Sequence, residues 1–168
     1  METLGKQLSN WDGKDKDEIH RIYRQFANRK NLFTQLIVLL SDQQSERGVT
    51  WLIKHHLEKG HLPSQSDTVT IIQQLPLLQH WESRLHLLQS LRYFTLPESE
   101  KRSLEVFVRK GLSDPNKFVR AWSYDGFFQL ARQFPEYRPV VTELFDMAIK
   151  DEPASVKARI RNLLKEGV

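Results

Sequence analysis

The sequence predicts an all-α protein built from repeated pairs of helices, and three observations support this fold class. Apolar residues recur three and four positions apart through most of the chain, which is the spacing of an amphipathic helix. Proline, glycine and aspartate interrupt that spacing at short intervals, as turns between helices do. The pattern also repeats itself about every 37 residues, which is typical of a helical solenoid.

Each helix is predicted from its own apolar spacing. The clearest periodic segments are 18–28, 32–40, 46–59 and 101–110. The segment 69–72 is rich in residues that favour strands, yet it follows Ser66-Asp67, a good N-cap pair, so a helix is expected there as well. We therefore expect about nine helices of about 10 to 18 residues joined by tight turns.

Four helices align in three columns of equivalent positions. The first column holds Val49, Leu87, Ser123 and Ile160, which are spaced by 38, 36 and 37 residues. The second column holds Leu52, Ser90, Gly126 and Leu163, and the third holds Ile53, Leu91, Phe127 and Leu164. We refer to this alignment as the register, and we expect its columns to form the core.

The segment from Asp114 to Phe127 resembles the turn and second helix of a HEAT repeat, and the segment from Asp151 to Leu164 resembles it again. In that family, the turn aspartate and the basic residue after valine join neighbouring repeats. The resemblance therefore implies structural roles for Asp114, Arg120, Asp151 and Lys157. Two departures occur earlier in the chain: Glu46 stands in place of the basic residue, and the third turn, 78–81, has no aspartate.

The resemblance implies a right-handed α–α superhelix, a HEAT/armadillo-like solenoid of about four repeats. We expect a single domain, 1–168. Its N-terminal capping helix is placed at 14–30, and its repeats at 31–60, 66–95, 98–134 and 136–167. HEAT arrays serve many tasks, so this fold leaves the function to be argued from surfaces.

The register also separates core from surface on each second helix. The inward positions of the family place Trp122 in the core, whereas Tyr124, Asp125 and Phe128 fall outside the core stripe. We interpret these positions as a concave face that binds a partner, since aromatic and arginine side chains anchor interfaces. The candidate partner-binding residues are Trp51, Lys54, Arg92, Tyr124, Asp125, Phe128, Arg161 and Lys165. The alternative is that the aromatic ones pack against the first helices of adjacent repeats.

The composition and the distribution of charge limit the partners, the kinds of site and the location that we expect for this protein. The net charge is +4, and the excess lies in residues 101–168, which hold 13 Lys/Arg against 9 Asp/Glu. Such an excess favours an acidic partner, either a nucleic acid or a protein. The absence of cysteine excludes disulfides and thiolate zinc sites. With no leader-like segment and no apolar run of membrane length, we expect a cytoplasmic protein that does not contact membranes.

Two segments carry residues that could do chemistry. Trp122 and Asp125 make the chain loosely similar to HEAT-like alkylpurine DNA glycosylases, which use aromatic residues and an essential aspartate, but no second tryptophan-rich helix completes a base pocket. His55, His56 and His61 could suggest a metal. Adjacent histidines point about 100° apart on a helix, so capping and packing are the expected roles, with His61 folding back after Gly60. We expect no catalytic residue, metal or cofactor.

The sequence therefore predicts a non-enzymatic HEAT-repeat scaffold or adaptor that binds a protein partner on its concave face. The alternative is a nucleic-acid-binding module of the same fold, related to the alkylpurine DNA glycosylases. Binding to nucleic acid should weaken steeply as salt rises, which separates the two classes.

Overall fold

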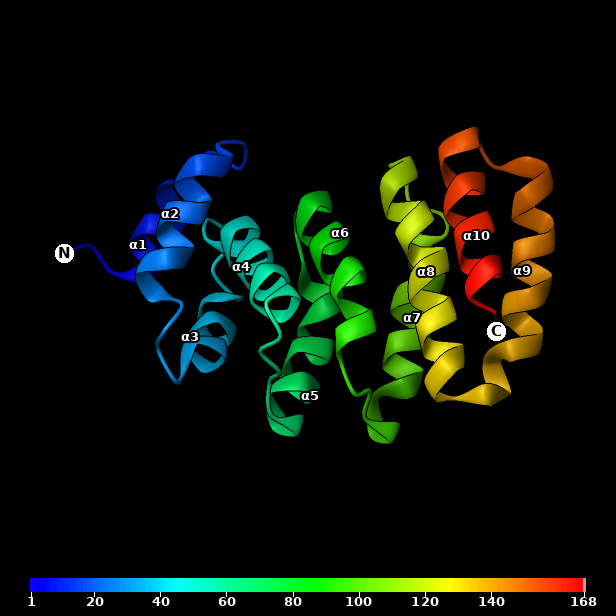
Figure 1. The fold of residues 1–168 in the computed structure, drawn as a ribbon, viewed down its shortest axis with the longest axis horizontal. Helices are drawn as coiled ribbons and strands as arrows, with labels where there is room; N and C mark the ends of the chain where they lie inside the picture. Colours follow the sequence, from blue (N-terminus) through cyan, green and yellow to red (C-terminus); the bar gives the residue numbers. More distant parts are fainter. Residues whose placement is uncertain (168) are drawn as a thin grey trace. The chain divides into compact units, whose positions relative to one another are not determined.

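The computed structural model describes residues 1–167, and within them all regular structure is helical, as predicted (Figure 1). The α-helices are α1 (Leu4–Asn10), α2 (Lys16–Phe26), α3 (Leu32–Leu39), α4 (Glu46–Glu58), α5 (Gln65–Gln74), α6 (Trp81–Ser90), α7 (Lys101–Gly111), α8 (Lys117–Gln133), α9 (Arg138–Asp151) and α10 (Ala154–Glu166). The short 3-10 helices are η1 (Leu75–Leu77), η2 (Leu91–Tyr93), η3 (Glu98–Glu100) and η4 (Pro135–Tyr137). Within these residues, no helix combines the length and apolar character needed to cross a bilayer.

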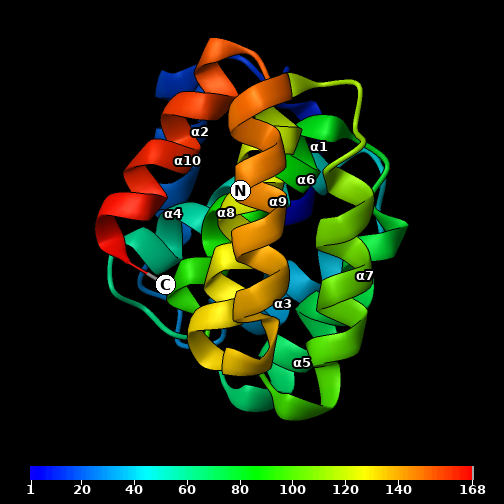
Figure 2. The same cartoon turned by 90° about the vertical axis from the view of Figure 1, so that its right-hand side faces the viewer.

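The chain forms two compact units, divided in the sequence after Phe94. In unit 1, α4 packs against α1, α3 and α6, while α2 packs on α1 and α5 on α3. In unit 2, which begins at Thr95, α8 contacts α7, α9 and α10 (Figure 2). The division lies close to the expected boundary between the repeats 66–95 and 98–134, and those repeat bounds stay a prediction. The single domain itself stays a prediction.

The predicted helices 18–28, 32–40, 46–59 and 101–110 are confirmed as α2, α3, α4 and α7. The segment 69–72 lies within α5, also as predicted. Its cap differs from the expected one, because the hydroxyl of Ser64 accepts the backbone N–H of Asp67 at 3.1 Å. Ser66 and Asp67 therefore occupy the first turn, where a carboxylate is favoured by the helix dipole.

Helix α8 is the centre of unit 2, and its sequence explains both its start and its burial. The side chain of Asn116 caps the helix by accepting the backbone N–H groups of Phe118 at 2.8 Å and Val119 at 3.3 Å. A hydrogen atom is the only side chain that fits at Gly111 of α7, since a Cβ there would collide with the hydroxyl of Ser123. The small residues thus bring α7 and α8 into close contact.

The register columns form the core with one exception. All residues of the first two columns are buried, as are Ile53, Leu91 and Phe127 of the third. Leu164, which was predicted to join them, is 51% exposed. The prediction is wrong at this position because no element among the described residues covers that side of α10.

In each unit, one residue connects a helix to a later turn. The connection runs from α4 to the turn before α6 in unit 1, and from α8 to the turn before α10 in unit 2. In unit 1, the buried carboxylate of Glu46 accepts the backbone N–H of Gln79 at 3.0 Å and that of His80 at 2.9 Å. In unit 2, Arg120 at the equivalent position donates from Nε to Glu152 at 3.2 Å. Glu46 therefore brings a carboxylate to a turn, 78–81, that has no acidic residue of its own.

Candidate functional site

The structure distributes the predicted partner-binding residues over both units. Trp51 and Lys54 lie on α4, and Arg92 lies in η2. In unit 2, α8 carries Tyr124, Asp125 and Phe128, whereas α10 carries Arg161 and Lys165. They differ in exposure: the residues on α10 and Arg92 are exposed, those on α4 are half-buried, and those on α8 are buried.

The prediction that Tyr124 and Phe128 face a partner is wrong, because both pack against α9. The ring of Phe128 stacks on Phe145 with centroids 6.5 Å apart, and Tyr124 meets the same ring edge-on at 6.2 Å. Burial, together with the nearby carboxylate of Glu152, raises the pKa of Tyr124 to about 12. The alternative assignment, packing against the first helix of the next repeat, describes these two residues.

Asp125 is 1% exposed and belongs to a polar cluster that joins α8 to α10. Its Oδ2 lies 3.3 Å from Nη1 of Arg159, and its Oδ1 accepts the side-chain amide of Gln129 at 3.2 Å. The guanidinium of Arg159 also covers the ring of Trp122, 4.2 Å from the ring centroid. The predicted openness of Asp125 to a partner is therefore wrong, because α10 holds this carboxylate in an ion pair.

Trp122 was predicted to be core, but its side chain is only half-buried. Its small neighbour Ser123 lies against Gly111 of α7. Trp122 lies instead on the α8–α10 side under Arg159. Arg159 was missed, although it stands at the register position of Trp122 in the next repeat, which is the signal that could have identified it.

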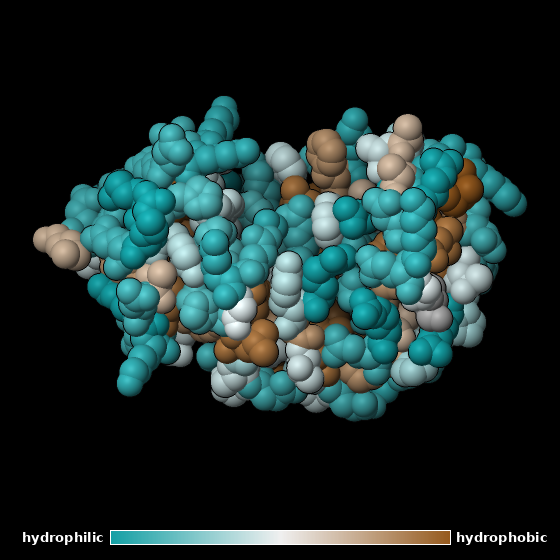
Figure 3. Space-filling model, in the orientation of Figure 1, coloured by the Kyte–Doolittle hydropathy of each residue, from teal (hydrophilic) through white to brown (hydrophobic). Residues whose placement is uncertain are grey.

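The exposed cations on α10 have no such partner. Neither Arg161 nor Lys165 has an ion pair or a hydrogen bond to another side chain within residues 1–167. By contrast, Lys54 of α4 is paired with Glu58, with Nζ 2.7 Å from Oε1. On the face shown in Figure 3, hydrophilic side chains predominate, with apolar ones gathered in small patches between them.

In unit 1, Trp51 belongs to a cluster of aromatic and imidazole rings on α2 and α4. His55 stacks on its indole with centroids 4.7 Å apart, and His20 meets the indole edge-on at 4.9 Å. Deeper in the cluster, the hydroxyl of Tyr23 and Nδ1 of His56 are hydrogen-bonded at 2.8 Å. The cluster therefore presents one half-buried tryptophan whose orientation is set by two histidines.

His56 illustrates why this cluster is a packing device. Burial, together with the neighbouring imidazoles of His61 and His55, lowers its pKa to about 4. His61 folds back after Gly60, as predicted, and stacks on His56 with centroids 4.0 Å apart. Across the part of the chain that the structure describes, no three His, Asp or Glu side chains are arranged to hold a metal ion.

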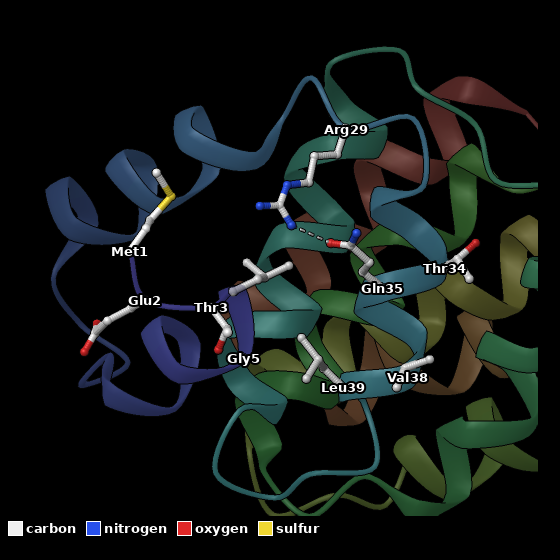
Figure 4. Close-up of a pocket in the computed structure, with 10 residues that line it drawn as sticks. Met1, Glu2, Thr3, Gly5, Arg29, Thr34, Gln35, Val38 and Leu39 are labelled. Atoms are coloured by element: carbon white, nitrogen blue, oxygen red, sulfur yellow. Dashed lines mark hydrogen bonds between the residues drawn. The ribbon is translucent and has the colours of Figure 1, made fainter.

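A further cavity, which the sequence did not indicate, opens between the N-terminal segment and α3 (Figure 4). Its volume is about 600 Å³, and apolar side chains such as Val38 and Leu39 form much of its wall. Arg29 crosses it to donate to the side-chain oxygen of Gln35 at 3.2 Å. The cavity has the size of a small-molecule site. However, two polar side chains of its wall, Arg29 and Gln35, are already hydrogen-bonded to each other.

Comparison of the sequence with protein-family models and with curated proteins found no match. Comparison with solved structures found none either.

Proposed function

We propose that this chain is a non-enzymatic, HEAT-like scaffold that binds a protein partner through the faces of its second helices. The observation that carries the proposal is a half-buried tryptophan held by a neighbouring ring or cation in each unit. Trp122 lies under the guanidinium of Arg159, and Trp51 is stacked on His55. In either unit, a partner would bury what remains exposed of the indole.

The physical case rests on preorganisation. A tryptophan that is already oriented loses little conformational freedom when a partner covers it, so more of the burial free energy contributes to affinity. Arg159 is fixed as well, because Asp125 binds it at 3.3 Å while its plane covers the indole. Tryptophan and arginine are among the residue types enriched in interface hot spots.

The proposed fold within this scaffold is the right-handed superhelix of four repeats with an N-terminal capping helix. Its support is the equivalence of Glu46 and Arg120, which stand at one register position and join their helices to the following turn. We further propose a cytoplasmic location, which the cysteine-free sequence supports. A solution-scattering curve that fits a globular helical bundle, and not a curved repeat array, would contradict the proposed architecture.

The experiment that tests the function is a pull-down from an extract of the source cells with a matched pair of variants. Trp122→Ala removes the held indole, whereas Phe118→Ala removes an exposed aromatic ring, 49% accessible, from the same helix. We expect the first variant to lose the captured proteins and the second to keep them, with circular dichroism showing both folded. An identical set of captured proteins for the two variants would contradict the proposal.

A second candidate function, nucleic-acid binding, is favoured by one specific observation. Trp122 and Arg159 form a stacked pair of flat groups, the guanidinium lying over the indole, and Arg161 adds an exposed cation on the same helix as Arg159. Bases stack on such surfaces regardless of sequence. A titration with duplex and single-stranded DNA at about 50 and about 200 mM salt tests it, since phosphate binding should fall steeply across that range. Absence of binding at the lower salt rejects this candidate.

A further inference from the structure

Two stripes of side chains in unit 2 occupy the same positions in the register. The α8 stripe consists of Arg120, Tyr124, Phe127 and Phe128. The α10 stripe, 37 residues later, consists of Lys157, Arg161, Leu164 and Lys165. Residues spaced by four, seven and eight positions lie on one side of a helix, so each stripe is a continuous face.

The α8 stripe is covered by the segment that follows it. Phe127 lies 6.3 Å from the ring of Tyr137 in η4, and Phe128 stacks on Phe145 of α9. At the end of that segment, the carboxylate of Glu152 binds Arg120 at 3.2 Å. A helix with apolar side chains along its middle and a carboxylate beyond one end is therefore what this face accepts.

The α10 stripe is open. Leu164 is 51% exposed, whereas its counterpart Phe127 is fully buried. Arg161 and Lys165 are exposed, and Lys157 is half-buried. None of these three cations has a side-chain partner among residues 1–167. The face that α9 and Glu152 fill on α8 is thus unfilled on α10.

We propose that the α10 stripe docks an acidic amphipathic helix of a partner protein, with Leu164 in the apolar seam and the three cations paired to carboxylates. This inference rests on the proposed scaffold function and names the partner's chemistry. The α8 stripe supplies the template, since Lys157 stands where Arg120 holds Glu152. Charge complementarity sets both the rate and the specificity of such docking.

The charges also argue against the other occupants. A second copy of this chain meeting the stripe through a two-fold axis would place Lys157, Arg161 and Lys165 against themselves, and the chain as a whole carries +4. A nucleic acid would pair with the cations but would leave Leu164 against phosphates and sugars. An acidic protein helix satisfies both the charge of the stripe and its apolar side chain.

The test uses a fluorescein-labelled synthetic helix of roughly 20 residues, with leucine along one face and glutamate on both flanks, and follows its anisotropy as the full chain is added. A second peptide carries lysine in place of every glutamate, and a duplex DNA of similar length and label serves as a third probe. We expect the acidic peptide to bind, and the lysine peptide not to bind.

A matched pair of variants locates the binding. Lys157→Glu with Lys165→Glu reverses two charges on the stripe, whereas Lys110→Glu with Lys150→Glu makes the same change at exposed positions of α7 and α9. We expect the stripe variant to weaken the acidic peptide by about tenfold or more and the control variant by less than about twofold. A stripe that is only a polar cap would bind neither peptide, and equal weakening by both variants would mean diffuse attraction; either result overturns the proposal.

Two further outcomes separate this inference from the function on which it rests. Stronger binding of the DNA, lost in the stripe variant, assigns the α10 stripe to nucleic acid and overturns the acidic-helix proposal. If the peptide fails while the Trp122→Ala pull-down still loses its proteins, the scaffold function stands and the acidic-helix inference alone is rejected.

Discussion

Helix α4 of unit 1 and helix α8 of unit 2 are connected to their neighbours at the same register positions, but by different kinds of side chain. The α4 stripe of unit 1, at the same register positions as the α8 stripe, consists of Glu46, Thr50, Ile53 and Lys54. There the join is made by a carboxylate on backbone N–H groups, and the hydroxyl of Thr50 is hydrogen-bonded to His86 at 2.9 Å. In unit 2, the guanidinium of Arg120 pairs with the carboxylate of Glu152, and the ring of Phe128 stacks on that of Phe145. The equivalent positions thus make connecting contacts in both units, while the residue types that make them differ.

The largest effect is expected where the α8 stripe is most buried. Phe128→Ala removes a fully buried ring that stacks on Phe145, so the free energy of unfolding should fall by about 3–5 kcal/mol. Urea unfolding followed by circular dichroism measures this loss. Lys165→Ala, at the equivalent position of α10, is the control and should change stability by less than about 0.5 kcal/mol. Similar losses for the two variants would mean that α10 is packed as α8 is.

Acid should destabilise unit 1 more than unit 2, because all six histidines of the chain lie in unit 1. Burial lowers the pKa values of His56 and His86 to about 4, with His61 and Lys54 respectively adding to the shift. In the unfolded chain both titrate near 6.5, so between these values the unfolded state binds more protons and stability falls as pH falls. Each histidine should cost about 2 kcal/mol by about pH 4.5.

Hydrogen exchange of backbone amides at neutral pH and near pH 4.5 resolves this effect by unit. After correction for the pH dependence of intrinsic exchange, the protection factors of the α4 amides should fall between the two pH values. His86→Gln should reduce this fall by about half. Equal loss of protection in α4 and α8 would show that the histidines do not govern the response.

A smaller effect is expected at the join of unit 1. Glu46→Gln keeps the shape of the side chain but replaces charge-assisted hydrogen bonds with neutral ones, so it should destabilise by about 1–2 kcal/mol. The loss should appear locally as faster exchange of the backbone amides of Gln79 and His80, which the carboxylate now accepts. Gln44→Glu, a charge change of opposite sign on an exposed neighbour, serves as control and should leave both amides protected. Unchanged exchange in Glu46→Gln would remove the carboxylate from the join.

The smallest stability effect is expected on the α10 stripe. Leu164→Ala should change the free energy of unfolding by less than about 0.5 kcal/mol, because half of this side chain is already exposed to water. The same substitution at the buried counterpart, Phe127→Ala, should cost about 3–5 kcal/mol. Thermal unfolding of the two variants side by side gives the comparison, and a Leu164→Ala loss approaching that of Phe127→Ala would show that the stripe is covered within the chain.

Much of the fold could be predicted from the sequence because helix periodicity and breakers are local signals. Which face each helix buries could be predicted only in part. Tyr124 and Phe128 lie outside the core stripe of α8, and only the position of α9 shows that this flank is covered too. The pairing of Glu46 with backbone N–H groups more than thirty residues away has no signature in composition or spacing. The Trp122–Arg159 contact could have been found, since both residues occupy one register position.

The most direct measurement of the central claim, that the open stripe of α10 meets a protein, is site-specific cross-linking. The chain contains no cysteine, so a Leu164→Cys variant carries a single benzophenone after labelling, and a Lys150→Cys variant on α9 carries the matched control. In an extract of the source cells, we predict a discrete adduct from the label at position 164 that protease removes and nuclease does not, and none from position 150. Identical adducts from both positions, no adduct from position 164, or an adduct that nuclease removes would contradict the account.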